Sequence, residues 1–195
     1  MKNADKRRRL IQAAMTLAYR HGFRQTSLAA IAKHAEVPLG NVYYYFKTKD
    51  EIGEAIVEER LSQMKMLQRK LGEIDSPKDR LCAFVQMTFD NRKMLARCGC
   101  PIGTLGTELN KEGGVLTKQS ALLFTELLGW LRAQFEAMDK QADIHGLAVH
   151  LLSALQGVAV LTHTLQDPEI VVIEAQRLQE WIQALGARGS ETGTP

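Results

Sequence analysis

Several features that mark particular protein classes are scarce or missing in this 195-residue chain. Its three cysteines are too few to staple a secreted disulfide scaffold, and an odd number cannot all pair within one chain. No apolar run is expected to reach the roughly 18 residues of a membrane helix, because His150, Ser153 and Gln156 interrupt the longest apolar region, residues 147–161. No apolar signal-peptide core follows the charged N-terminus. These absences predict a cytoplasmic protein with no membrane partner.

Net charge is also small, at +3, but it is unevenly distributed. Residues 1–50 hold ten Lys and Arg against three Asp and Glu, whereas residues 51–195 hold fifteen against nineteen. A basic first quarter followed by an acidic remainder predicts two modules, of which the first faces a polyanion. Apolar residues make up 45% of the chain and charged residues 24%, which is typical of a globular protein and excludes a disordered one.

Apolar residues recur with the helical period almost throughout, and no stretch shows the alternation of a strand. We therefore predict an all-α fold in which a three-helix helix-turn-helix domain precedes a helical ligand-binding and dimerisation domain. The expected domains are 1–47 and 48–186, with 187–195 as a flexible tail. Capping residues, Gly and Pro delimit the expected helices, which are 5–21, 27–34, 38–46, 48–71, 76–97, 105–109, 115–138, 141–165 and 168–185.

Two short helices joined by about three residues, with a longer helix able to pack across both, have the layout of a helix-turn-helix. In that motif the second short helix enters the major groove of double-stranded DNA. The residues displayed by this reading helix are Leu39, Gly40, Asn41, Tyr43, Tyr44 and Tyr45. Asn41 can donate and accept at base edges, whereas Val42 and Phe46, four residues apart, are expected to face the core.

Basic residues flank the reading helix. Lys47 and Lys49 lie beside the start of the next helix, whose exposed N–H groups favour phosphate oxygens. The run Arg7–Arg9 is predicted to be a flexible arm that reaches the DNA backbone or a minor groove.

Gly22-Phe23 and residues 26–51, TSLAAIAKHAEVPLGNVYYYFKTKDE, resemble the DNA-binding signature of TetR-type transcriptional repressors. The resemblance implies a homodimer with about nine helices per chain, bound to a palindromic operator and released by a small-molecule effector. It also implies DNA contacts at the matching positions, which are Thr26, Leu39, Gly40, Asn41, Tyr43, Tyr44 and Lys49. Ser27, Tyr45 and Lys47 complete the predicted DNA-binding set.

Two positions depart from the family pattern. Glu36 stands at the turn where many members have Gly, so strain is expected there if its φ is positive. Leu39 stands where many members have a polar residue, which points to contact with a thymine methyl group instead of a hydrogen bond.

The second domain is expected to carry the dimer interface and the effector pocket. Helix 141–165 is apolar around most of its surface, so it must be buried on more than one side. Together with helix 168–185 it predicts a four-helix interface between two chains, with Leu151, Leu155, Val158, Leu178, Trp181 and Ile182 at the interface. The predicted apolar pocket residues are Phe84, Met87, Met94, Cys100, Leu105, Phe124 and Leu127.

Two alternatives stay open. Cys98 and Cys100 lie at a helix break beside Arg97, and family members that respond to electrophiles or oxidants have a cysteine matching Cys100, so a thiol sensor on the same scaffold is one alternative. The other is a small helical enzyme or binding protein whose basic N-terminus is incidental. No catalytic motif, metal-ligand spacing or Gly-rich phosphate loop stands out, so no catalytic residue, metal or cofactor is expected.

Overall fold

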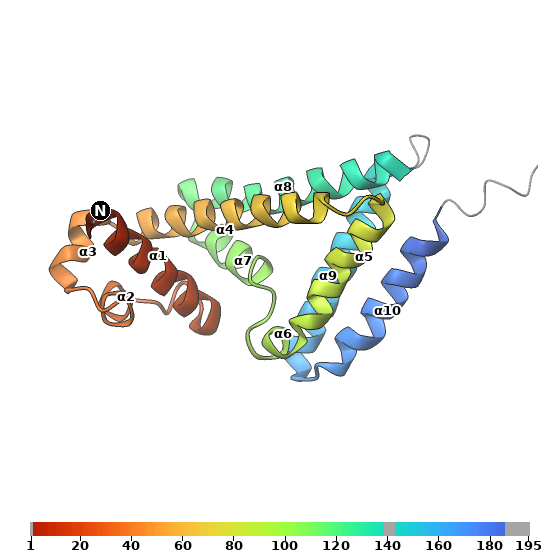
Figure 1. The fold of residues 1–195 in the computed structure, drawn as a ribbon. Helices are drawn as coiled ribbons and strands as arrows, with labels where there is room; N and C mark the ends of the chain where they lie inside the picture. Colours follow the sequence, from red (N-terminus) through yellow and green to blue (C-terminus); the bar gives the residue numbers. More distant parts are fainter. Residues whose placement is uncertain (1, 139–142, 186–195) are drawn as a thin grey trace, which may run out of the picture. The chain divides into compact units, whose positions relative to one another are not determined.

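A computed structural model describes residues 2–138 and 143–185, which form ten α-helices and no strand (Figure 1). This confirms the predicted all-α fold. The helices are α1 (Lys2–His21), α2 (Leu28–His34), α3 (Leu39–Tyr45), α4 (Lys49–Gly72), α5 (Pro77–Asp90), α6 (Arg92–Cys98), α7 (Gly103–Glu112), α8 (Gly114–Met138), α9 (Ile144–Leu165) and α10 (Glu169–Ala184).

The chain divides into two compact units, and the division falls inside α4 and inside α8. The first unit contains Met1–Met64 and Pro101–Thr125, and the second contains Lys65–Cys100 and Glu126–Pro195. Most of α4 and all of α7 therefore group with the first three helices, whereas the sequence placed a boundary after residue 47. The expected tail at 187–195 lies outside the described residues.

Capping residues set the helix ends in the first unit. Gly22 ends α1 with a φ of +86°, a conformation that a residue with a Cβ rarely adopts. Ser27 caps α2 by accepting a hydrogen bond from the N–H of Ala30 at 3.1 Å. Leu10 of α1, Ile31 of α2 and Val42 of α3 are at most 1% exposed, so one core underlies the three helices of the predicted helix-turn-helix.

In the second unit, α10 packs against α5 and α9, and α6 packs against α9. Leu95, Val158, Ala159 and Val171 form a buried cluster where α6, α9 and α10 meet. The single helix expected over 76–97 is interrupted at Asn91, whose φ of −92° and ψ of 9° lie outside the helical region. This break produces ten helices in the described residues where the family resemblance implied about nine.

Among the described helices, α9 alone is long and apolar enough to cross a membrane, with a mean hydropathy of 1.7 over its most apolar window. The expectation that no segment reaches this length was wrong, because His150, Ser153 and Gln156 lower the average too little. One third of that window is buried inside the protein. Core helices of globular proteins meet the same criterion, and Val158 and Ala159 of α9 lie in the buried cluster of the second unit.

Candidate nucleic-acid interface

Helix α3 presents a large exposed face over a buried anchor. Leu39, Tyr43 and Tyr44 are 41%, 49% and 69% exposed, whereas Val42 is fully buried and Phe46, just after the helix, is 2% exposed. The prediction that Val42 and Phe46 face the core is therefore confirmed. Exposed aromatic side chains of this size on a short helix form a surface suited to contact with a groove and its phosphates.

The remaining α3 residues differ in accessibility. Gly40 is exposed, and a Cβ built there would meet no atom within 4 Å, so the backbone is open to close approach. Asn41 is half-buried. Tyr45 is half-buried and packs edge-on against Tyr44, with ring centroids 5.0 Å apart.

Thr26 and Ser27, adjacent residues before α2 that were both predicted to contact DNA, differ in their exposure. Ser27 is exposed and caps the helix. Thr26 is only 4% exposed, and its hydroxyl donates to the carbonyl of Gly22 at 2.8 Å. The side chain of Thr26 thus packs into the α1–α2 loop, and sequence spacing did not show this burial.

A capping arrangement joins α3 to α4. The hydroxyl of Thr48 accepts from the N–H of Glu51 at 3.2 Å, as the sequence predicted. The carboxylate of Glu51 accepts from the N–H of Lys47 at 2.7 Å, one residue earlier than in the usual capping box. Lys47 also donates through Nζ to the carbonyl of Tyr43, at the end of the reading helix.

Lys49 supports the α1–α2 loop from the first turn of α4. Its Nζ donates to the carbonyl of Arg24 at 2.7 Å and lies 4.9 Å from the centroid of the Phe23 ring. A cation over a ring face is attracted by the ring's electron density. Lys49 therefore holds the loop that precedes α2, in addition to carrying charge.

The three arginines near the N-terminus belong to α1, which begins at Lys2, so they are not a flexible arm as the sequence suggested. Arg7 lies over the Phe46 ring at 5.4 Å, and Arg8 pairs with Asp5 at 3.1 Å. Arg9 reaches the turn between α2 and α3. Each of the three arginines thus contacts a different partner.

Comparison with known proteins identifies this module. Residues 10–56 match the model of the family described as "Bacterial regulatory proteins, tetR family". A protein from Lactococcus lactis subsp. lactis, described as an uncharacterized HTH-type transcriptional regulator in the lacX 3' region, is 24% identical over 92% of this chain and 94% of its own. Residues 10–56 are therefore a TetR-family DNA-binding domain.

Two further TetR-family relatives extend the likeness. The HTH-type transcriptional repressor NemR of Escherichia coli is 30% identical over 55% of this chain and 54% of its own. The solved structure of its reduced form has a TM-score of 0.77 at 19% identity and covers 90% of this chain and 96% of that one. FadR of Bacillus subtilis, solved in complex with stearoyl-CoA, has a TM-score of 0.70 at 18% identity over 90% of this chain and 96% of that one. These structural matches show that the fold is shared.

The TetR-family assignment decides between the function classes that the sequence left open. The chain is a DNA-binding transcriptional regulator and not an enzyme, as the sequence predicted. Among residues 2–138 and 143–185, no three His, Cys, Asp or Glu side chains are grouped in a way that could hold a metal ion.

Five of the six predicted dimer-interface residues of the regulator are buried inside the chain itself. Leu151, Leu155, Val158, Leu178 and Ile182 are at most 6% exposed, and Trp181 is half-buried against Phe135 and His150. They cannot supply a free surface, so this part of the prediction needs correction. Because α9 is apolar on nearly all sides, its sequence did not reveal which face packs inside the chain.

The opposite face of α9 is exposed and apolar. Val160, Leu161 and Leu165 are 63%, 53% and 63% exposed, and Ile173 of α10 is 56% exposed. Beside them runs a groove of about 370 Å³, lined by Ala154, Gly157, Val158, Leu161, Ile170, Ile173, Glu174 and Arg177.

The predicted pocket residues are divided between the two units. Phe84, Met87, Met94, Cys100 and Leu127 belong to the second unit, and Leu105 and Phe124 belong to the first. In the second unit, Phe84 packs against Trp130 with centroids 5.4 Å apart, and Cys100 lies against the buried cluster of α6, α9 and α10. In the first unit, Leu105 lines a cavity of only about 10 Å³.

Of two residues that organise the DNA-binding module, sequence reasoning gave Arg9 another role and missed Glu108 altogether. Arg9 of α1 donates to the turn before α3, and Glu108 of α7 accepts from the α1–α2 loop. Both are single charged residues on helices with many others, and both act over long sequence separations. No pattern in one sequence distinguishes them from solvated charges.

Proposed function

We propose that this TetR-family regulator is a homodimeric, cytoplasmic repressor that binds a palindromic operator and is released by a small molecule. The observation that carries the proposal is the α3 face, where Leu39, Tyr43 and Tyr44 stand exposed over the buried Val42. The similar NemR of Escherichia coli is a transcriptional repressor, which supports repression as the mode of action.

Direct DNA contacts are proposed for the exposed or half-buried members of the predicted set, which are Ser27, Leu39, Gly40, Asn41, Tyr43, Tyr44, Tyr45, Lys47 and Lys49. Asn41 reads a base edge, and the tyrosine hydroxyls bind phosphates. Lys47 and Lys49 each use one donor on a backbone carbonyl in this structure. An ammonium group has three donors, so each lysine keeps two for phosphate oxygens.

A second copy of the chain is the proposed occupant of the exposed apolar face on α9 and α10. A palindrome presents two half-sites about one helical turn apart, and a dimer reads both at once. Gly157 and Ala154 on the same face are small enough to let two helices approach closely. The proposed interface residues are therefore Val160, Leu161, Leu165 and Ile173, in place of the buried residues named from the sequence.

The effector is proposed to be a small apolar molecule, in line with the Met and aromatic residues predicted for its pocket. FadR, which shares the fold, was solved in complex with stearoyl-CoA. That complex supports the idea that this helical fold accommodates a ligand with a long apolar chain.

The test is a nuclease footprint on the DNA upstream of the regulator's own gene, combined with a measurement of molar mass. We expect a protected palindrome at low salt and the mass of a dimer. Val160→Glu should yield a monomer that loses the footprint, whereas Leu122→Glu, at a half-exposed apolar residue of α8, should keep both. An unprotected upstream region at low salt, or a wild-type monomer on DNA, would count against the proposal.

One contact favours a thiol sensor as a second candidate. Nε2 of Gln156 in α9 lies 3.6 Å from Sγ of Cys100, which lies two residues after the end of α6. Addition of the Cys100 thiolate to a soft electrophile, with loss of the thiol proton to solvent, would place a bulky group against the α6–α9 contact. Cys100→Ser should then keep operator binding but lose release by N-ethylmaleimide, while Cys82→Ser keeps it. Unchanged release from Cys100→Ser rules the sensor out.

A further inference from the structure

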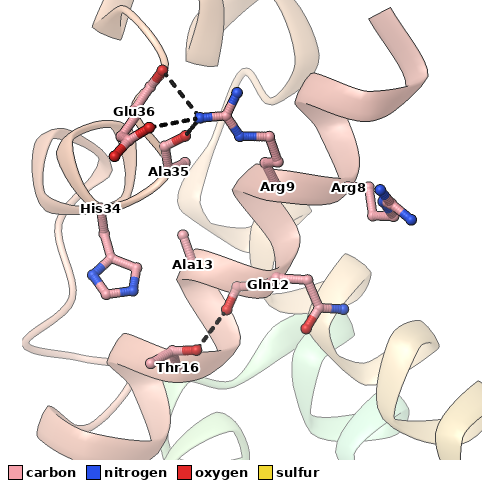
Figure 2. A pocket seen from close by; sticks show the side chains of 8 residues that line it. All are labelled: Arg8, Arg9, Gln12, Ala13, Thr16, His34, Ala35 and Glu36. Atoms are coloured by element: carbon pink, nitrogen blue, oxygen red, sulfur yellow. Dashed lines mark hydrogen bonds and ion pairs between the residues drawn. The ribbon is translucent and has the colours of Figure 1, made fainter. Parts of the chain in front are cut away.

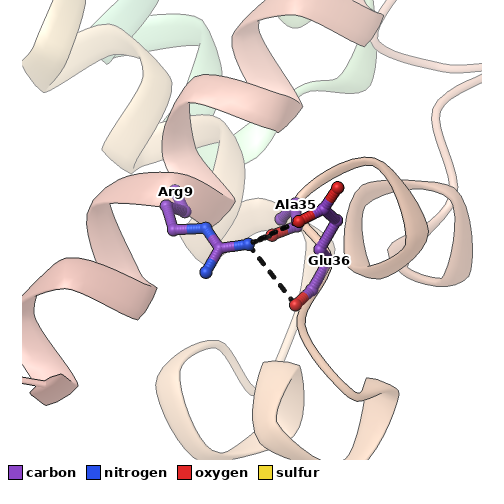
Figure 3. Close-up of polar contacts among 3 residues, drawn as sticks. All are labelled: Arg9, Ala35 and Glu36. Carbon is purple, nitrogen blue, oxygen red and sulfur yellow. Dashed lines mark hydrogen bonds and ion pairs between the residues drawn. The ribbon is translucent and has the colours of Figure 1, made fainter.

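Arg9 of α1 is bonded to the turn that joins α2 to α3 (Figure 3). Its Nη2 donates to the carbonyl of Ala35 at 2.5 Å and lies 3.5 Å from the carbonyl of Glu36. The same nitrogen lies 3.4 Å from the Glu36 carboxylate. One guanidinium therefore meets three oxygens of a two-residue segment, across 26 positions of sequence.

That segment needs support for two reasons. Glu36 has a φ of +52°, in the left-handed region that costs a residue with a side chain roughly 1 kcal/mol or more. The backbone bonds at the end of α2 use the carbonyls of Ile31, Ala32 and Lys33. The carbonyls of Ala35 and Glu36, which follow, take a donor from Arg9. A cation at this position also complements the negative end of the α2 dipole.

The turn determines where α3 points. Its flanking residues Ala35 and Val37 are both 5% exposed, and the N–H of Val37 donates back to the carbonyl of Ala32 at 3.0 Å. Only Pro38 separates Val37 from the first residue of α3. A change in the backbone conformation of Glu36 should therefore change the direction of α3, because only two residues separate them.

We propose that Arg9 is a positioning residue for DNA reading, which fixes the Glu36 turn and hence the direction of α3 without touching DNA. The inference rests on the proposed role of α3 as the reading helix. It assigns Arg9 a role different from that of a phosphate-binding arm, because the Nη2 nitrogen is directed to the turn and not to solvent.

Arg8 provides the contrast within the same helix. Figure 2 shows both arginines at the cleft between α1 and the end of α2, with the Arg9 side chain directed to the turn and the Arg8 side chain away from it. The Arg8 side chain is 75% exposed and pairs with Asp5, whereas that of Arg9 is 41% exposed. Arg8→Ala removes the same charge as Arg9→Ala and leaves the turn untouched, so it is a matched control.

The experiment measures the affinity of the full-length regulator for its operator and for a random duplex over a series of salt concentrations. A phosphate contact contributes about 0.9 to the slope of log K against log salt, whereas a positioning residue contributes nothing. Arg9→Ala should bind the operator about tenfold more weakly than Arg8→Ala, with an equal salt slope and equal affinity for the random duplex. A slope lower by about one, with both duplexes weakened alike, would overturn the proposal.

Two further variants address the turn itself. Arg9→Lys keeps the positive charge, so it should bind the operator more tightly than Arg9→Ala but less tightly than the wild type. Glu36→Gly allows a positive φ without strain, so it should bind the operator as tightly as the wild type does. The double variant Arg9→Ala, Glu36→Gly should bind the operator at least about threefold more tightly than Arg9→Ala alone. A double variant that binds no better than Arg9→Ala contradicts the proposal.

A readout without DNA separates this inference from the proposed function. Amide hydrogen exchange of the segment 35–38 should be faster in Arg9→Ala than in wild type and normal in Arg8→Ala. If the wild type protects no palindrome, the operator proposal fails, while exchange still reports on the turn. If exchange and operator affinity are both unchanged in Arg9→Ala, the positioning role fails and the operator proposal stands.

Discussion

Glu108 and Arg24 are joined by a hydrogen bond in which the backbone N–H of Arg24 donates to Oε2 of Glu108 at 3.1 Å. Glu108 belongs to α7, and Arg24 lies in the loop between α1 and α2. The same loop receives Lys49, whose Nζ donates to the carbonyl of Arg24. One residue of the loop is therefore held at its N–H by an anion and at its carbonyl by a cation, from two different helices.

We expect Glu108→Ala to lower the free energy of unfolding by about 1–2 kcal/mol, because the charged acceptor for the Arg24 N–H is lost. Glu108→Gln retains an acceptor and should cost less. Lys111→Ala, an exposed change in the same helix, is the control and should stay within about 0.5 kcal/mol of wild type. Urea denaturation measures all three. Equal stability of Glu108→Ala and Lys111→Ala would show that the bond carries no net stabilisation.

Gly53 of α4 lies at a close contact. A Cβ there would lie 2.9 Å from Cδ2 of Leu116 and 3.1 Å from Cζ of Phe23. Gly53→Ala should therefore destabilise the protein by about 1–3 kcal/mol, although Ala is the better helix former. Gly129→Ala in α8, where a Cβ would meet nothing within 4 Å, should stabilise it by about 0.5–1 kcal/mol. Thermal unfolding of the two variants should shift in opposite directions, and a shift in the same direction contradicts the contact.

Asn41→Ala should weaken binding to the operator by about 1–3 kcal/mol, because one base-edge contact is lost, and should relax sequence preference at one position. Tyr44→Phe removes a hydroxyl that we assign to a phosphate, so it should weaken the operator and a random duplex alike. Fluorescence anisotropy with both duplexes measures the two effects. A uniform loss from Asn41→Ala would assign Asn41 to the backbone instead.

Burial raises the pKa of the Cys82 thiol, and a hydrogen bond from Gln183 opposes this by stabilising the thiolate. Because the thiolate is the nucleophile, Cys82 should react with iodoacetamide more slowly than an unhindered thiol at neutral pH. Its rate should rise with pH to a midpoint above the usual range. Gln183→Ala should move that midpoint higher. Rates measured in a Cys98→Ala, Cys100→Ala background test this, and a midpoint at or below that of a free thiol would contradict it.

Local signals in the sequence predicted most helix ends, because capping depends on neighbouring residues. Ser27 and Ser76 cap the helices that follow them, and Gly22 ends α1. The same local reasoning assigned Val42 and Phe46 to the core, since a separation of four residues places two side chains on one helical face.

Features that depend on distant residues could not be predicted in this way. Thr26 and Ser27 are adjacent polar residues, yet only contacts with the preceding loop decide that Thr26 is buried. Arg7, Arg8 and Arg9 look equivalent in sequence, and their three different partners follow from the packing of α1 against α2 and α3. The face of α9 that packs inside the chain is likewise selected by α6 and α10.

The bond from Arg9 to the Ala35 carbonyl has a consequence for exchanging DNA specificity between regulators. A hybrid that inherits α2 and α3 from one parent and α1 from another would set a foreign side chain against the turn that Arg9 supports here. The smallest segment that can be transplanted with its reading geometry intact therefore begins before residue 9 and includes all of α1, even though the contacts proposed with bases begin only at α3.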